Sequence, residues 1–115
     1  MLNHVVMLKF KPNVKETEIK DLENALDKLP NSIVEIQMYE FGRDVIHSVR
    51  SFDFALVSLF ANTNALSRYA SHPEHMAVLE KIKKISQNVV TVDFEGTDAS
   101  DFKEKTPDSI LPDDF

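Results

Sequence analysis

The segment of residues 52–61, FDFALVSLFA, carries apolar side chains on both faces that a β-strand would present. Side chains alternate along a strand, so Phe54 and Leu56 would share one face while Val57 lies on the other. The aromatic and β-branched content of the segment favours a strand over a helix. A strand that is apolar on both sides needs cover on both sides of its sheet, and this requirement limits the folds open to the chain.

Further strands and helices are expected on either side of this segment. The spacing of apolar residues predicts strands at 4–11, 33–41, 52–61 and 89–95, and helices at about 17–29, 64–70 and 73–86. Pro30 is expected to end the first helix, because proline disfavours the helical conformation of the residue before it. The order is β-α-β-β-α-β when the last two helical segments are counted as one helix. This order predicts an α+β, ferredoxin-like fold with an antiparallel sheet.

One face of such a sheet has no helix to cover it. The first strand places Val5 and Met7 opposite Val6 and Leu8, so this face is apolar as well. A continuous apolar face of this kind is unfavourable in water. We therefore expect a homodimer in which the open sheet faces of two copies pack against each other.

The composition is that of a globular protein, with 43% hydrophobic and 28% charged residues over 115 positions. The apolar runs are far shorter than the roughly 20 residues that a membrane span needs. The opening residues, MLNHVVMLKFK, lack the cationic stretch of a signal peptide. We therefore expect one cytoplasmic domain that does not bind a membrane. The absence of cysteine excludes disulfides, thiolate nucleophiles and cysteine-bound metals.

The negative charge is concentrated near the C-terminal end. Residues 1–96 carry 11 basic and 13 acidic side chains, and residues 97–115 carry 2 basic and 6 acidic ones. The nearest basic cluster, Lys81, Lys83 and Lys84, is explained by the C-terminal end of a helix, so no nucleic-acid partner is expected. The sequence predicts a domain over residues 1–96 and an acidic C-terminal tail over residues 97–115.

The stretch YASHPEH, residues 69–75, places a tyrosine and two histidines around a proline. Because of Pro73, the helix that carries Tyr69 is expected to break at His72. Pro73 suits the first position of the next helix, with His72 as its N-cap. This break would allow Tyr69, His72 and His75 to converge from two helical segments.

His75 is expected to face the protein interior, because it shares a helical stripe with Leu79. An inward histidine can be purely structural, with a backbone carbonyl as its partner. It can also line a pocket together with His4, whose strand face carries Val6 and Leu8. The sequence leaves both interpretations open.

The H-x-x-H spacing of His72 and His75 is also compatible with a metal site. A catalytic metal commonly takes three protein ligands. The other two histidines are not expected near this pair, because His47 lies in a polar loop and His4 on a distant strand. No third ligand is therefore identified, and we expect no metal.

Four segments together resemble a known family. HVVMLKFK, FDFALVSLFAN, YASHPEH and VVTVDFEG are similar to segments of the stress-responsive A/B barrel (Dabb) family, and the likeness covers residues 3–96. The resemblance implies a dimeric α/β barrel of two ferredoxin-like subunits. A plant member of the family is a polyketide cyclase, which performs an intramolecular aldol condensation without metal or cofactor.

The resemblance also implies roles for individual residues. Tyr69 matches the catalytic tyrosine and His75 the general base, while His4 and His72 match polar positions near the pocket and Leu56 a pocket wall. A neutral histidine can take a proton α to a carbonyl, and a tyrosine hydroxyl can stabilise the oxyanion that forms. The first helix, KDLENALDKL, lacks the aromatic residues of the cyclase, so the resemblance does not extend to the substrate.

These observations favour two functions, neither of which requires a cofactor, and the resemblance leaves the metal, haem or oxygen chemistry of the wider dimeric α+β barrel superfamily as a remaining alternative. The first is a homodimer that binds a small hydrophobic or aromatic molecule in a pocket between sheet and helices. The alternative is a cofactor-independent cyclase, isomerase or lyase, with His75 as general base and Tyr69 as oxyanion donor. In both cases the predicted substrate-binding residues are His4, Val6, Leu8, Leu56, His72 and Leu79.

Overall fold

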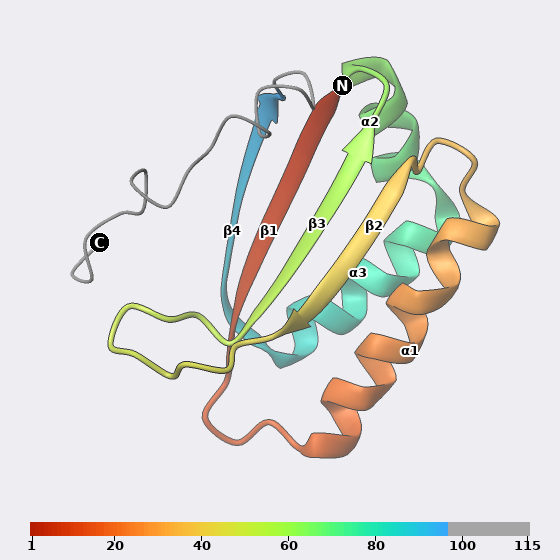
Figure 1. The fold of residues 1–115 in the computed structure, drawn as a ribbon. Coiled ribbons are helices and arrows are strands. Elements are labelled where there is room, and N and C mark those ends of the chain that lie inside the picture. The colour runs from red at the N-terminus through yellow and green to blue at the C-terminus, as the bar shows by residue number, and fades with distance from the viewer. Residues whose placement is uncertain (97–115) are drawn as a thin grey trace, which may run out of the picture.

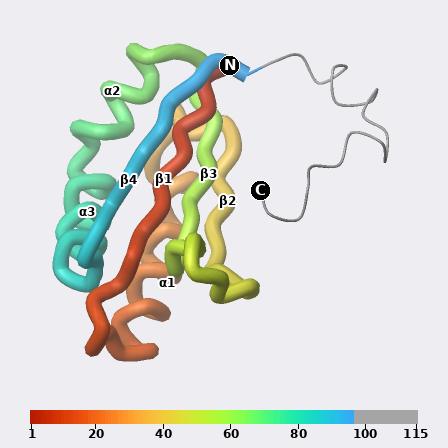
Figure 2. Tube along the Cα trace, turned by 90° about the vertical axis from the view of Figure 1, so that its left-hand side faces the viewer, coloured from red at the N-terminus to blue at the C-terminus, as the bar shows by residue number. Residues whose placement is uncertain are grey.

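A computed structural model describes residues 1–96 as one four-stranded sheet with three helices on one side of it (Figures 1 and 2). The elements are β1 (Leu2–Phe10), α1 (Glu16–Ser32), β2 (Met38–Arg43), β3 (Phe54–Phe60), α2 (Thr63–Ser71), α3 (Pro73–Ile85) and β4 (Ser86–Glu95). This arrangement confirms the predicted ferredoxin-like α+β fold. The predicted acidic tail, residues 97–115, lies outside the described residues.

The strand order is β2-β3-β1-β4, and every neighbouring pair is antiparallel. β1 and β3 are therefore the central strands, as the apolar segment around β3 indicated. The register places His4 of β1 beside Ser58 of β3 on one side and Asp93 of β4 on the other. Residues far apart in the sequence thus become neighbours on the face that the helices cover.

The hydrophobic core fills the space between this face and the helices. β1, β3 and the three helices contribute the residues that their alternating or helical spacing turns inward. The core includes Val6, Leu8, Leu22, Leu26, Leu29, Ile33, Phe54, Leu56, Phe60, Tyr69, Val78, Ile82 and Ile85, all of them less than a tenth exposed.

The opposite face of the sheet is apolar and uncovered within residues 1–96. Its most exposed apolar side chains are Met7 (42%), Met38 (37%), Val90 (40%), Val92 (51%) and Phe94 (48%). The register places them on the same side as Val5 and Val57, away from the helices. We refer to this surface as the open sheet face.

Several boundaries differ from the sequence prediction: β1 and β4 begin at Leu2 and Ser86 rather than at 4 and 89, and the differences at α1 and β2 have a clear cause. The prediction that Pro30 ends the first helix is wrong, since α1 continues through it to Ser32. Pro30 removes one backbone donor close to the helix end, and burial of Leu29 and Ile33 (2% and 1% exposed) together with the Ile33 amide bond to the Leu29 carbonyl (2.9 Å) retains the last turn. As a consequence β2 begins at Met38 rather than near Ile33.

No helix among residues 1–96 combines the length and apolar character that crossing a membrane requires.

Candidate functional site

A cavity of about 270 Å³ lies between the covered face of the sheet and the helices. Its walls come from β1, β3 and β4 below and from α1, α2 and α3 above. The lining residues are His4, Val6, Leu26, Leu56, Leu66, Tyr69, Ala70, His75, Val78, Leu79, Ile82, Val89 and Thr91. We call this cavity the helix–sheet pocket. Most of its wall is aliphatic, and its hydrogen-bonding side chains are two histidines, a tyrosine and a threonine.

The break between α2 and α3 brings Tyr69 and His75 together. His72 has an extended backbone (φ −66°, ψ 135°), which is the conformation that Pro73 favours for the residue before it. Its Nδ1 accepts a hydrogen bond from the Glu74 amide (3.1 Å), so His72 is the N-cap of α3. The change of direction at His72 lets the rings of Tyr69 and His75 pack with their centroids 4.3 Å apart.

His75 is held neutral and in a defined orientation. Its Nδ1–H donates to the Ala70 carbonyl at the end of α2 (3.0 Å), which leaves Nε2 as the ring nitrogen with a free lone pair. Burial lowers the pKa of His75, and the nearby His4 and His72 lower it further, although the Ala70 carbonyl opposes this shift. At neutral pH the side chain can therefore accept a hydrogen bond or a proton from a bound molecule.

His4 reaches the pocket from the sheet and is paired with a carboxylate. Its Nδ1–H donates to Asp93, the residue beside it on β4. The carboxylate fixes the tautomer and orients the ring, as acidic partners of functional histidines commonly do. The His4 side chain is 15% exposed, whereas that of Asp93 is 41% exposed at the sheet edge.

Tyr69 is almost completely buried (1% exposed), and its hydroxyl is hydrogen-bonded to the hydroxyl of Tyr39 on β2 (2.7 Å). Burial raises the pKa of Tyr39 well above its usual range. Burial also raises the pKa of Tyr69, although the hydrogen bond with Tyr39 opposes this shift. Both side chains are therefore neutral at physiological pH. For Tyr69 to donate its proton to a bound molecule, Tyr39 has to act as the donor within the pair.

The structure brings together six of the eight residues that the sequence singled out. His4, Val6, Leu56, Tyr69, His75 and Leu79 all line the helix–sheet pocket. The predicted lining residues Leu8 and His72 do not. Leu8 is packed in the core (2% exposed), and the His72 side chain is engaged as the helix cap.

Two functional neighbours were missed by sequence reasoning. Tyr39 and Asp93 lie next to the site because of the strand register, which pairs Tyr39 with Ser58 and Asp93 with His4. The available signal was alternation, since Asp93 and Thr91 share one face of the predicted last strand. Alternation identifies the face but not which residue of a neighbouring strand lies opposite.

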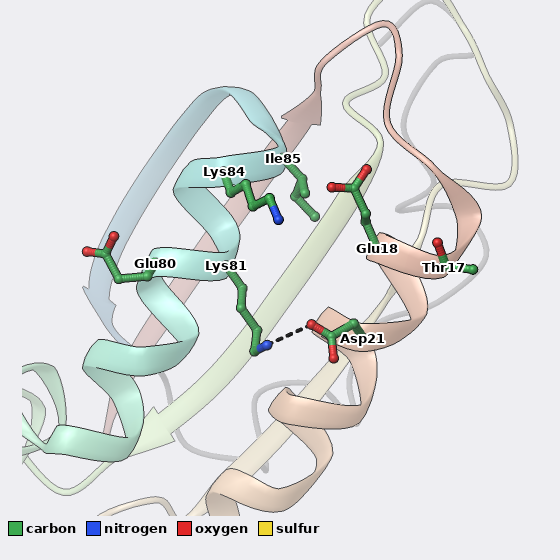
Figure 3. Close-up of a pocket in the computed structure, with 7 residues that line it drawn as sticks. All are labelled: Thr17, Glu18, Asp21, Glu80, Lys81, Lys84 and Ile85. Atoms are coloured by element: carbon green, nitrogen blue, oxygen red, sulfur yellow. Dashed lines mark hydrogen bonds and ion pairs between the residues drawn. The ribbon is translucent and has the colours of Figure 1, made fainter.

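A second hollow of about 330 Å³ lies between α1 and α3. Figure 3 shows that its side chains are mostly charged, with Lys81 directed at Asp21 across the gap (2.7 Å). Both partners are substantially exposed (42% and 63%). Such a surface ion pair joins two helices and does not distinguish a ligand site.

Within residues 1–96, no cluster of three or more histidine, aspartate or glutamate side chains is arranged to hold a metal ion. The H-x-x-H pair itself is engaged elsewhere, because Nδ1 of His72 binds the Glu74 amide and Nδ1 of His75 binds the Ala70 carbonyl.

The fold and the pocket define a ferredoxin-like α+β domain with a small-molecule-sized cavity on the helical side of its sheet. Residues 2–96 match the family model described as Stress responsive A/B Barrel Domain (Dabb), and the chain belongs to this family. The expectation from the sequence motifs is confirmed.

Similar proteins include the stress-response A/B barrel domain-containing protein DABB1 of Arabidopsis thaliana, which is 24% identical over 115 residues. The match covers 97% of this chain and 51% of DABB1, so the chain spans about half the length of that relative. A crystal structure of a dimeric ferredoxin-like protein of unknown function from Thermobifida fusca is similar with a TM-score of 0.75 and 29% identity, covering 81% of this chain and 88% of that one.

The structure of the hydroxynitrile lyase of Passiflora edulis is also similar, with a TM-score of 0.76 over 92% of this chain and 96% of that chain. The two sequences are 15% identical, so this likeness concerns the fold alone.

Proposed function

We propose that this protein is a homodimer that binds a small, mainly apolar molecule in the helix–sheet pocket. The observation that carries the proposal is the pocket itself. It combines a volume of about 270 Å³ and aliphatic walls with a few polar side chains, of which His4 and His75 both lie against the Tyr69 ring. Concave, mostly apolar cavities with a small number of polar groups are the usual form of small-molecule sites.

The polar groups favour a ligand with one hydrogen-bonding group on an apolar body. His75 offers Nε2, because its Nδ1 is bound to Ala70, and His4 offers Nε2, because its Nδ1 is bound to Asp93. The aliphatic part of the ligand would lie against Val6, Leu56 and Leu79. Burial of that part supplies affinity, and the imidazoles supply orientation.

The open sheet face supports the dimer. Its five most exposed apolar side chains are between 37% and 51% exposed in the isolated subunit. Contiguous apolar surface of this kind commonly marks an interface. The similar protein from Thermobifida fusca is described as dimeric, and packing of two open sheet faces would bury both at once through a symmetric contact.

A second candidate function is a cofactor-independent enzyme that transfers a proton. The neutral state of His75 favours it, because burial lowers the pKa of this side chain and leaves Nε2 able to accept a proton. In such a step Nε2 would take the proton from carbon α to a ligand carbonyl. Tyr69, if supplied with a hydrogen bond by Tyr39, would donate to the enolate oxygen that forms.

The first experiment tests whether the pocket binds ligands at all. A library of aromatic and polyketide-like compounds is screened by ligand-observed NMR against the wild type and Ala70→Trp, which fills the pocket from α2. Ala77→Trp is the matched control, since Ala77 is also an exposed helical alanine but does not line this pocket. We expect binding to wild type and Ala77→Trp that is lost in Ala70→Trp. A screen without hits, or hits unaffected by Ala70→Trp, would contradict the proposal.

The same hits distinguish binding from catalysis. Ketones that bind are incubated with the protein in D₂O, and exchange at the carbon α to the carbonyl is followed by NMR. An enzyme with His75 as base would accelerate this exchange, and His75→Gln would abolish it while retaining ligand binding. Equal exchange rates with and without protein would leave binding as the function.

A further inference from the structure

The helix–sheet pocket has no permanently charged side chain on its walls. Among residues 1–96, no lysine, arginine, aspartate or glutamate lines this pocket. The titratable side chains among them are His4, Tyr69 and His75. His75 is kept neutral by burial, and Tyr69 is neutral for the same reason.

Two cations of the surrounding helices are engaged outside the pocket. On α2, Arg68 is bound to Glu35 (2.9 Å), and on α3, Lys81 is bound to Asp21 of α1 (2.7 Å). Both pairs lie on helix faces other than the one that lines the cavity. A negatively charged ligand would therefore find no guanidinium or ammonium group in the pocket wall.

The positive end of α3 is occupied as well. The Glu74 amide donates to the His72 imidazole (3.1 Å) and the Met76 amide to the His72 carbonyl (2.9 Å). Glu74 also places a carboxylate in the first turn. Pro73 has no amide hydrogen, and the amides of Glu74 and Met76 are already used by the chain itself, which leaves fewer donors for an anion at this helix N-terminus.

A negative charge lies directly beside one lining residue of the pocket. The Asp93 carboxylate is bound to Nδ1 of His4, which is itself a lining residue. A ligand carboxylate next to His4 would face Asp93 across one imidazole ring. Burying an anion without a cationic partner is costly, and a second anion nearby increases that cost.

We propose that the helix–sheet pocket selects by charge and takes uncharged molecules, with an apolar body and one neutral hydrogen-bonding group that can donate, such as an amide or hydroxyl, in preference to their carboxylates. This inference rests on the proposed binding function and specifies its ligand class. The N–H of a neutral amide or the O–H of a hydroxyl can donate to Nε2 of an imidazole without a desolvated charge. The aliphatic walls are the same for both members of such a pair.

The test uses isosteric probes that differ in charge. Affinities of 2-naphthamide and 2-naphthoate, and of the smaller benzamide and benzoate, are measured by ligand-observed NMR at neutral pH with the wild type. We expect each amide to bind at least about tenfold more tightly than its carboxylate, because the carboxylate has to lose hydration without gaining a cation. Equal affinities, or tighter binding of the carboxylates, would overturn the charge selection while leaving the pocket as a ligand site.

Added cations provide the reverse experiment. Leu79→Lys places an ammonium group on the pocket wall, and Met76→Lys adds the same charge to α3 at an exposed position outside the lining. We expect Leu79→Lys to raise naphthoate affinity and to reduce or reverse the preference for the amide, whereas Met76→Lys leaves the preference unchanged. If Leu79→Lys does not fold, Val89→Lys serves instead, since Val89 lines the pocket from the edge strand and is 44% exposed.

Failure of this inference is distinguishable from failure of the proposed function. If neither member of either pair binds the wild type, or if binding is unaffected by Ala70→Trp, the pocket is not the binding site and both proposals fall. If the amides and carboxylates bind equally in the pocket, and Leu79→Lys does not change their ratio, only the charge selection falls.

Discussion

At His75, a backbone carbonyl and the surrounding apolar residues together determine which atom a ligand can contact. The Ala70 carbonyl engages Nδ1 (3.0 Å), and burial opposes protonation of Nε2. The sequence placed His75 on the inward stripe of its helix. It could not decide between a structural histidine and a pocket histidine, and in the structure the residue has both a carbonyl partner and a place in the pocket wall.

The lowered pKa of His75 predicts a pH dependence of stability. The unfolded chain binds this proton near the usual pKa of about 6.5, but the folded protein binds it only at lower pH. The contribution of His75 to the free energy of unfolding is therefore present above about pH 6.5 and is lost as the pH falls towards the folded-state pKa. In urea denaturation between about pH 7.5 and 5, we expect His75→Gln to show a weaker loss of stability than wild type.

The control for this experiment is His47→Gln, because the His47 side chain is 78% exposed in the β2–β3 loop. This variant should retain the wild-type pH dependence. If His75→Gln also retains it in full, burial does not set the protonation state of His75.

The Tyr39–Tyr69 pair gives a direct optical prediction. The chain has two tyrosines and no tryptophan, so phenolate absorbance reports on this pair alone. Burial raises the pKa of both hydroxyls, and we expect no phenolate in the native protein near the usual pKa of about 10. Absorbance and circular dichroism should instead change together, at the pH where the protein unfolds. Phenolate that forms near pH 10 in the folded state, as it should in a urea-unfolded control, would show that the pair is not buried.

At the level of helices and strands, the clearest sequence signal was the break in YASHPEH. The prediction that His72 ends one helix and caps the next is confirmed by its extended backbone and its bond to the Glu74 amide. The reason is local, because Pro73 restricts His72 whatever surrounds them. The same local role explains why His72 does not reach the pocket.

The capping role of His72 can be measured separately from ligand binding. We expect His72→Ala to lower the free energy of unfolding by about 1 kcal/mol, the usual value of a lost N-cap. His72→Asn should retain most of the stability, since its side chain can accept the Glu74 amide. Met76→Ala, at an exposed site on the same helix (51% exposed), is the control and should have little effect. A loss with His72→Asn as large as with His72→Ala would contradict a cap role.

Pro30 shows where local reasoning fails. A proline ordinarily ends a helix, yet α1 continues to Ser32 because Leu29 and Ile33 are buried against the core. Tertiary packing outweighs one missing backbone hydrogen bond near the helix end. The spacing of Leu29 and Ile33 in the sequence is compatible with a helix that continues beyond Pro30. How much their burial stabilises the last turn became evident only from their packing against the core.

At the level of the whole molecule, the open sheet face predicts the effect of one inserted charge. Val92 is 51% exposed on this face, on the edge strand β4 beside Val5 of β1. If two copies pack through it, Val92→Lys buries an unpaired cation at the contact and should dissociate the dimer. Sedimentation equilibrium should then give the 13.1 kDa mass of one chain rather than twice that value.

Val34→Lys is the control for this prediction. Val34 is more exposed (87%) but lies between α1 and β2, outside the open sheet face. This variant should remain dimeric. A dimer that survives Val92→Lys, or a monomeric wild type, would show that the open sheet face is not the interface.

The sequence by itself determined the order of elements, the faces of each strand, the helix break at Pro73 and the membership of the family, because periodicity and proline geometry act over a few neighbouring residues. Only the tertiary structure decided the register. The tertiary structure places Asp93 beside His4 and the Tyr39 hydroxyl against that of Tyr69. It also buries Leu8 in the core and extends α1 beyond Pro30. These outcomes depend on contacts between residues far apart in the chain, whose relative positions are fixed only when sheet and helices pack together.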